Sequence, residues 1–188
     1  MKNVLLQLIV MTVIVTTTRC SSGVSNSAGY KDQQVIAAVL RTISDDQRCA
    51  PCLLETESSP YQPWVTETAG ARTAVSAEMM TAYARRNGKH RKLPGSSLMT
   101  GYRLIQPTDV SRYFEMGPRE GWDRLRADFG PRVGLVRISL PAYSSSDTEA
   151  LITYSYDAGP LGGETNYVGL SRRNGVWRTE KSTHIIMS

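Results

Sequence analysis

Strict alternation of apolar and polar residues dominates the last third of the chain, from residue 133 onward. Successive side chains of a strand point to opposite faces of a sheet, so an alternation with period two predicts half-buried antiparallel strands. The apolar positions of the two clearest runs are Val136, Ile138 and Leu140, followed by Ala150, Ile152, Tyr154 and Tyr156. Residues 183–187 offer a last strand. This third of the chain is therefore predicted to form an antiparallel β-meander.

The dipeptide Asn174-Gly175 predicts a hairpin within this meander, because a two-residue turn of the primed type needs positive φ at both positions. The turn sets the register of the two strands that it joins. The expected pairs are Arg173 with Val176, Arg172 with Trp177, Leu170 with Thr179, and Val168 with Lys181. Apolar Leu170 marks the buried face, so Trp177 is expected to be buried, with the stem of Arg172 across its ring.

Apolar residues spaced three and four apart predict helices in the middle of the chain. The predicted ranges are 30–44, 76–87, 108–114 and 118–129. Ser76 is a candidate N-cap, and Gly88 follows the last turn of the same helix. Pro118 opens the final helix and Gly130-Pro131 closes it, as is usual for helix ends.

These elements predict a single α+β domain over residues 24–188, with four or five antiparallel strands and helices packed on one face. The stretch 58–72 contains Pro60 and Pro63 and is expected to be a loop with a short strand at residues 64–66. The glycine-rich run at residues 159–163 connects two strands. No helix follows it, so it is interpreted as a turn and not as a phosphate-binding loop.

The amino terminus has the features of an export signal. Lys2 precedes an apolar run, residues 4–15, which small polar residues follow. A membrane-spanning helix needs ~20 apolar residues, so residues 1–23 are predicted to be a cleaved signal peptide, with an uncleaved anchor as the alternative. Cleavage is expected after Gly23 or Gly29. Cys20, followed by Ser-Ser-Gly, resembles the lipidated Cys of bacterial lipoproteins, although Arg19 stands where such signals carry a small residue.

Charge and cysteine content agree with export. The formal net charge is +5. Removal of Lys2 and Arg19 leaves 20 basic and 17 acidic residues, or +3, which gives no strong nucleic-acid signal. The remaining pair, Cys49 and Cys52, is predicted to form a structural disulfide, since an exported chain favours oxidation. The spacing resembles the thioredoxin redox motif, which makes a thiol redox protein the alternative. That motif needs a strand before it and a helix after it, whereas here the order is reversed.

Little in the chain points to catalysis, and no cofactor or metal is expected. The basic run of residues 85–92 is interpreted as the solvated end of a helix, and the alternative is an anion-binding site. Two histidines, His90 and His184, have no Cys or carboxylate at zinc-ligand spacing. Carboxylates are scattered along the chain, so a hydrolase-like acid pair has no local signature.

The carboxyl half carries a set of short motifs that resembles a group of uncharacterised bacterial exported proteins. They include Trp122-Asp123-Arg124-Leu125, the turn Gly159-Pro160-Leu161-Gly162-Gly163, Asn174-Gly175-Val176-Trp177 and a terminal Ser188. The group tends to end in Trp-x-Ser and to carry Cys in its Gly-rich turn, and this chain has neither. The likeness spans roughly 80 residues and implies no activity. The hairpin after early helices also resembles NTF2-like domains, which implies a pocket between sheet and helices.

The sequence thus predicts an exported protein, periplasmic, in the cell envelope or extracellular. We expect a non-catalytic binding or structural module, with membrane contact only through the signal or a lipid on Cys20. A hydrolase-like or ligand-binding NTF2-like pocket protein and a thiol redox protein are the alternatives. An enzyme would need a concave pocket in which ionisable groups with perturbed pKa values converge.

Overall fold

The structure, a computed structural model, describes residues 27–45, 48–60, 75–95 and 99–187. The helices in these ranges are α1 (Ser27–Asp45), α4 (Ala77–Arg86), α5 (Pro107–Tyr113) and α6 (Pro118–Phe129). The strands are β1 (Cys52–Glu55), β2 (Tyr102–Ile105), β3 (Gly134–Ile138), β4 (Ala142–Tyr143), β5 (Glu149–Gly159), β6 (Gly162–Arg173) and β7 (Val176–Met187). The expected signal at residues 1–23, Cys20 and the short strand at 64–66 lie outside the described residues.

All seven strands belong to one sheet with the order β2-β1-β3-β5-β6-β7, and β4 pairs with β5. β1 runs parallel to both β2 and β3, while the other pairs are antiparallel. The predicted single α+β domain is confirmed, although the sheet is mixed and larger than the expected meander of four or five strands. β2 and β4 span only four and two residues. Segments this short carry too few positions for an alternation to show.

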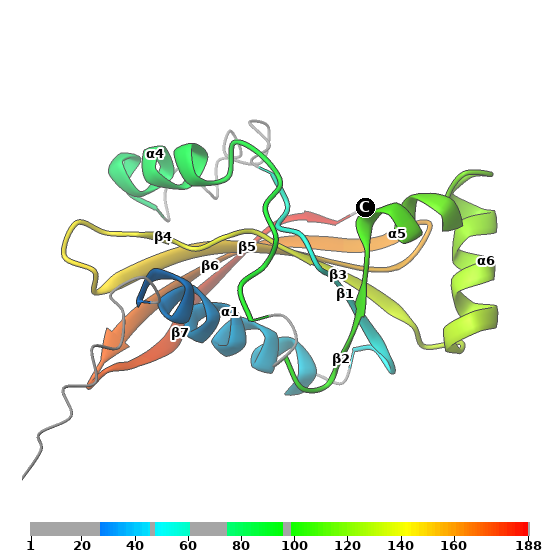
Figure 1. Cartoon of the computed structure of the whole chain (residues 1–188), viewed down its shortest axis with the longest axis horizontal. Coiled ribbons are helices and arrows are strands. Elements are labelled where there is room, and N and C mark those ends of the chain that lie inside the picture. The colour runs from blue at the N-terminus through cyan, green and yellow to red at the C-terminus, as the bar shows by residue number, and fades with distance from the viewer. Residues whose placement is uncertain (1–26, 46–47, 61–74, 96–98, 188) are drawn as a thin grey trace, which may run out of the picture.

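Helices cover both faces of the sheet, where the sequence predicted one (Figure 1). Neighbouring residues of a strand point to opposite faces. Leu54 belongs to the core cluster under α1, whereas Leu53 packs with Trp122 and Leu125 of α6. The same split separates Ile152, on the α1 side, from Leu151, which packs with residues of α4. α1 therefore covers one face, and α4, α5 and α6 share the other.

The hairpin between β6 and β7 has the predicted turn, with φ of 52° at Asn174 and 79° at Gly175. Pairing near the turn matches the expectation: Arg172 lies opposite Trp177, and Leu170 lies opposite Thr179. Farther along, a bulge adds one residue to β7. The partner of Val168 is therefore Ser182, where the sequence predicted Lys181.

The ends of α4 follow the predicted signals. The Ser76 hydroxyl oxygen accepts a hydrogen bond from the Met79 N–H at 3.2 Å, which satisfies one of the free N–H groups of the first turn. At the other end the Asn87 side chain lies buried and pairs with both backbone groups of Leu140, at 2.8 and 3.0 Å. These two contacts hold the helix at a set distance from the sheet.

An ion pair joins α1 and α4 beside the short strand β4. Asp32 of α1 is 6% exposed, and its carboxylate accepts hydrogen bonds from Arg86 of α4 and from the Tyr143 hydroxyl, the latter at 2.9 Å. Burial, and then the Asp32 charge, raise the pKa of Tyr143 far above its usual range, so the phenol stays protonated and donates. Lys31 lies 3.7 Å from the centroid of the Tyr143 ring. The carboxylate thus connects helices that lie on opposite faces.

None of the helices among the described residues combines the length and the hydropathy that a bilayer span requires.

Candidate functional site

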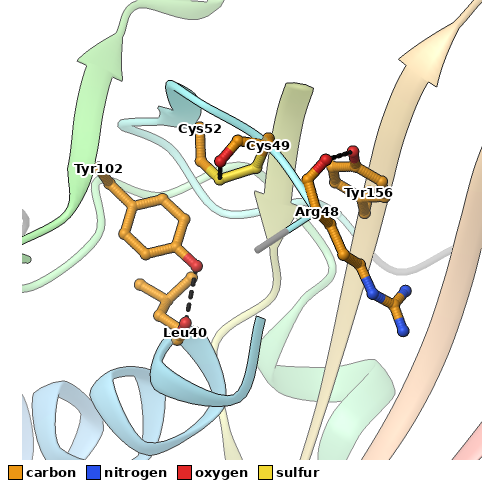
Figure 2. Close-up of a disulfide and its surroundings, with 6 residues drawn as sticks. All are labelled: Leu40, Arg48, Cys49, Cys52, Tyr102 and Tyr156. Carbon is orange, nitrogen blue, oxygen red and sulfur yellow. Dashed lines mark hydrogen bonds between the residues drawn. A yellow bond between two sulfur atoms is a disulfide. The ribbon is translucent and has the colours of Figure 1, made fainter. Parts of the chain in front are cut away.

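The two cysteines predicted to pair are joined by a disulfide between α1 and β1, with Cα atoms 5.0 Å apart (Figure 2). Cys52 is the first residue of β1 and is 5% exposed, and Cys49 is half-buried. The motif follows a helix and opens a strand, as the sequence indicated. A thioredoxin-like site places its first Cys at the amino terminus of a helix, which lowers the pKa of that thiol. Here the pair lies after α1 and at the start of β1.

Hydrogen bonds to backbone groups hold the loop around the disulfide. The Tyr156 hydroxyl donates to the Arg48 carbonyl at 2.7 Å (Figure 2). The Ala50 N–H donates to the Arg132 carbonyl at 2.9 Å. Gly134 of β3 lies against the pair: an added Cβ there would come within 2.8 Å of the Cys49 Cβ and 2.6 Å of the Tyr156 ring. Close packing on this side leaves little room for a substrate thiol. A local structural staple fits this geometry better than a redox centre.

We expect the disulfide to be present in the purified protein, and its loss to cost at most ~2 kcal/mol, because the closed loop is short. Trypsin should release both cysteines in one peptide that begins after Arg48. Mass spectrometry of protein that is unfolded and alkylated without reductant should find that peptide unalkylated, and alkylated twice after reduction. Two free thiols at the outset, or reduction of insulin by the protein, would reject the staple.

The basic run after α4 is dispersed over the surface. Arg86 turns back to the buried Asp32 carboxylate, while Arg85, Lys89, Arg91 and Lys92 are exposed. The Nδ1 atom of His90 lies 3.0 Å from the Ser58 carbonyl oxygen. The residues thus do not converge on a common point, and a solvated helix end describes them.

Two carboxylates near β3 are held by one cation. Arg137 donates to Glu55 and to Asp157, each at 2.5 Å. Both acids therefore share one guanidinium as their ion-pair partner. An ion-pair network across the sheet describes these two carboxylates.

A groove of about 580 Å³ lies between β2, α5 and α6. Gly121 lets the two helices meet closely, because an added Cβ would lie 2.3 Å from the Phe114 ring. Phe114 in turn packs edge-on against buried Trp122, with ring centroids 5.8 Å apart. The groove is lined by Leu104, Ile105, Asp109, Arg112, Tyr113, Arg124, Ala127, Asp128 and Phe129. Its strand, β2, is an edge strand of the sheet (Figure 1).

The groove combines an apolar surface with aromatic rings. Ile105 is buried at its base, and Leu104 on the same strand is 42% exposed. The rings of Tyr113 and Phe129 have centroids 6.1 Å apart and are tilted by 58°. The guanidinium of Arg103 lies 5.5 Å from the Phe129 centroid. An apolar surface with a few oriented polar groups is the usual composition of a ligand site.

Charged groups of both signs line the rim. The Tyr113 hydroxyl donates to Asp128 Oδ2 at 2.6 Å, and this hydrogen bond is the main cause that raises the pKa of Tyr113 to about 12. Arg112 pairs with Asp109 at 3.2 Å. Arg124 lies with Nη2 2.7 Å from the Met116 sulfur. Within the described part of the chain, neither Arg124 nor Asp128 has an ion-pair partner.

A second, more polar cleft of about 700 Å³ separates α4 from β4 and the turn after it. Its α4 wall is a helical stripe with Glu78 near one end and Arg85 near the other, and Ser144 and Ser145 line the far wall. Arg86 and Asp147 also line it, but each is already paired, with Asp32 and Lys31. Two of its charged lining residues, Glu78 and Arg85, are left for a ligand, as many as in the groove at β2, but this cleft has one aromatic ring, that of Tyr143, where the groove at β2 has two.

The groove at β2 was not predicted from the sequence. Its helices were expected, but β2 itself gave no alternation, so nothing placed Leu104 beside Tyr113 or Asp128. The one available signal was the position of Asp128 four residues after Arg124 on a predicted helix. In the described ranges, no three His, Cys, Asp or Glu residues lie where they could share a metal ion.

Comparison of the chain with family models, with curated proteins and with solved structures finds no match in any of the three.

Proposed function

We propose that this protein is an exported, non-catalytic binding module that takes its ligand in the groove between β2, α5 and α6. The observation that carries the proposal is the exposed apolar surface of the groove, above all Leu104, flanked by an acid and a base for which the described residues supply no ion-pair partner. A single exposed leucine is common on protein surfaces. The informative point is that Leu104 lines a cavity of ligand size together with the rings of Tyr113 and Phe129.

Export is supported by the charged start and apolar run within residues 1–23 and by the disulfide of the domain. A disulfide persists in an oxidising compartment such as the periplasm or the extracellular space. Both features favour a ligand that is met outside the cytoplasm.

The chemistry of the groove favours binding over catalysis. A phenol with a pKa of about 12 neither takes up nor releases a proton readily near neutral pH, so Tyr113 acts as a hydrogen-bond donor. Its partner Asp128 is oriented by that bond and lies on the exposed side of α6. Arg124 offers N–H donors and no acceptor. Together these groups can recognise a charged ligand but lack a poised general base.

Titration with a neutral apolar probe tests the site. N-acetyl-L-leucinamide, added to ¹⁵N-labelled protein, should shift amide resonances of β2, α5 and α6 and leave those of the β6–β7 hairpin in place. Leu104→Ser should weaken this binding by about 5- to 30-fold, since burying a leucine side chain contributes roughly 1–2 kcal/mol.

Val176→Ser is the matched control, because Val176 is also an exposed apolar strand residue, at 56%, and begins β7 at the hairpin turn. The turn end of the β6–β7 hairpin lies far from β2 (Figure 1). That variant should bind as the parent protein does. Shifts confined to other parts of the sheet, or equal effects of the two substitutions, would contradict the proposed site.

A further inference from the structure

We infer that the ligand of this groove is a short apolar peptide bound as a zwitterion, with its terminal ammonium at Asp128 and its terminal carboxylate at Arg124. The inference rests on the proposed function of the groove and names the class of ligand. Three features carry it: two opposite charges without ion-pair partners, their spacing on one helix, and the apolar surface beside them.

The first feature is the state of the two charges. Asp128 and Arg124 both line the groove, yet they do not pair with one another. Asp128 accepts the Tyr113 hydroxyl, which leaves its other oxygen free for a cation. Within the described ranges, the hydrogen bond of the Arg124 side chain goes to the Met116 sulfur, a weak acceptor that a carboxylate would displace at little cost. The groove therefore offers one site for a positive group and one for a negative group.

The second feature is the placement of both charges on one helix. Residues four apart on a helix lie on the same side, with Cβ atoms about 5–6 Å apart. An extended peptide advances ~3.3–3.6 Å per residue, so the two termini of a dipeptide are roughly 7 Å apart, and side chains of this spacing can meet both termini. A free amino acid carries a single side chain, so it would bury less apolar area in the groove than a dipeptide.

The third feature is the surface on which the peptide side chains would lie. Ile105 of β2 packs in the same cluster as buried residues of α6, the Phe129 ring continues this apolar surface, and Leu104 lines the groove at the exposed edge strand. A peptide held by its termini on α6 can turn its side chains toward this surface. Branched or aromatic side chains would gain most, because the stabilisation grows with the apolar area removed from water.

Calorimetric titration of the purified protein with L-leucyl-L-leucine and its capped forms tests the inference. The free dipeptide should bind about 3- to 10-fold more tightly than either N-acetyl-leucyl-leucine or leucyl-leucinamide, in line with charged hydrogen bonds at an exposed site. Free leucine should bind more weakly than the dipeptide. If both capped forms bind as well as the free dipeptide, the zwitterion is rejected, although the groove remains a binding site.

Two variants assign the termini. Asp128→Asn should remove the preference for a free ammonium and keep the preference for a free carboxylate, and Arg124→Gln should do the reverse. Asp123→Asn is the control, since Asp123 lies on the same helix, pairs with Arg126 and does not line the groove. If neither variant changes the preference it is expected to change, the assignment is overturned. If neither the dipeptide nor the neutral probe binds, the proposed function fails as well.

Discussion

Replacing Trp177 with alanine should lower the free energy of unfolding by about 3–5 kcal/mol, the range for removing a large aromatic side chain from a core. Trp177 is 5% exposed and belongs to the core cluster that α1 covers. The centroid of its ring lies 5.7 Å from that of Tyr143 on β4, whose hydroxyl donates to Asp32. Loss of the Trp177 ring would therefore also expose the Tyr143 ring. The surrounding strands are long and paired, and they cannot collapse into the space left behind.

Urea melts monitored by circular dichroism measure the effect, and Arg172→Ala is the control. Arg172 lies opposite Trp177 with its guanidinium 6.0 Å from the indole centroid, but it is exposed, so its loss should cost under ~1 kcal/mol. A near-neutral Trp177→Ala together with a costly Arg172→Ala would mean that this side of the hairpin is not part of the core.

The elements whose ends are marked by nearby turn or capping residues could be predicted from the sequence. The helix from Pro118 to Phe129 has the predicted bounds, because proline and glycine stand at its two ends. The turn at Asn174-Gly175 also set the first three cross-strand pairs correctly. In both places neighbouring residues determine the backbone, and no distant contact competes with them.

Long-range features escaped the same reasoning. The parallel pairing of β1 with β2 joins Cys52 to Tyr102, fifty residues apart, and no turn residue encodes such a contact. The bulge beside Gly169 moved the register by one residue, and a bulge has no reliable local signature in a strand of varied composition. The strands of the meander are also apolar on both faces near Leu151, which is why a second layer of helices was missed.

The candidate groove is also a feature that depends on contacts between residues far apart in the sequence. Its residues come from β2, α5 and α6, and only the fold brings Leu104 to Tyr113 and Asp128. The disulfide was predictable because its partners are three residues apart. The order of the neighbouring elements favours a structural role for it over a redox role. The likeness of the carboxyl half to bacterial exported proteins and to NTF2-like domains stays a prediction.

Asp32→Ala should lower the free energy of unfolding by about 2–4 kcal/mol. Removing one partner of a buried ion pair leaves the other charge uncompensated, at a cost of ~3–5 kcal/mol, and the partial exposure of Arg86, at 32%, reduces that cost. The Tyr143 hydroxyl loses its acceptor in the same change. Because Asp32 and Arg86 come from helices on opposite faces, the loss should loosen both layers at once.

Asp147→Ala provides the comparison, since Asp147 pairs with the neighbouring Lys31 but is 62% exposed, and such surface pairs contribute under ~1 kcal/mol. A double-mutant cycle of Asp32→Ala with Arg86→Met, measured by urea melts, isolates the pair itself. We expect a coupling of about 1–3 kcal/mol, because the two side chains share one network. Two outcomes would contradict this prediction: additive effects of the two single changes, or an Asp32→Ala cost no larger than that of Asp147→Ala. Either would mean that only the apolar faces of α1 and α4 hold these helices on the sheet, and that the ion pair does not stabilise the fold.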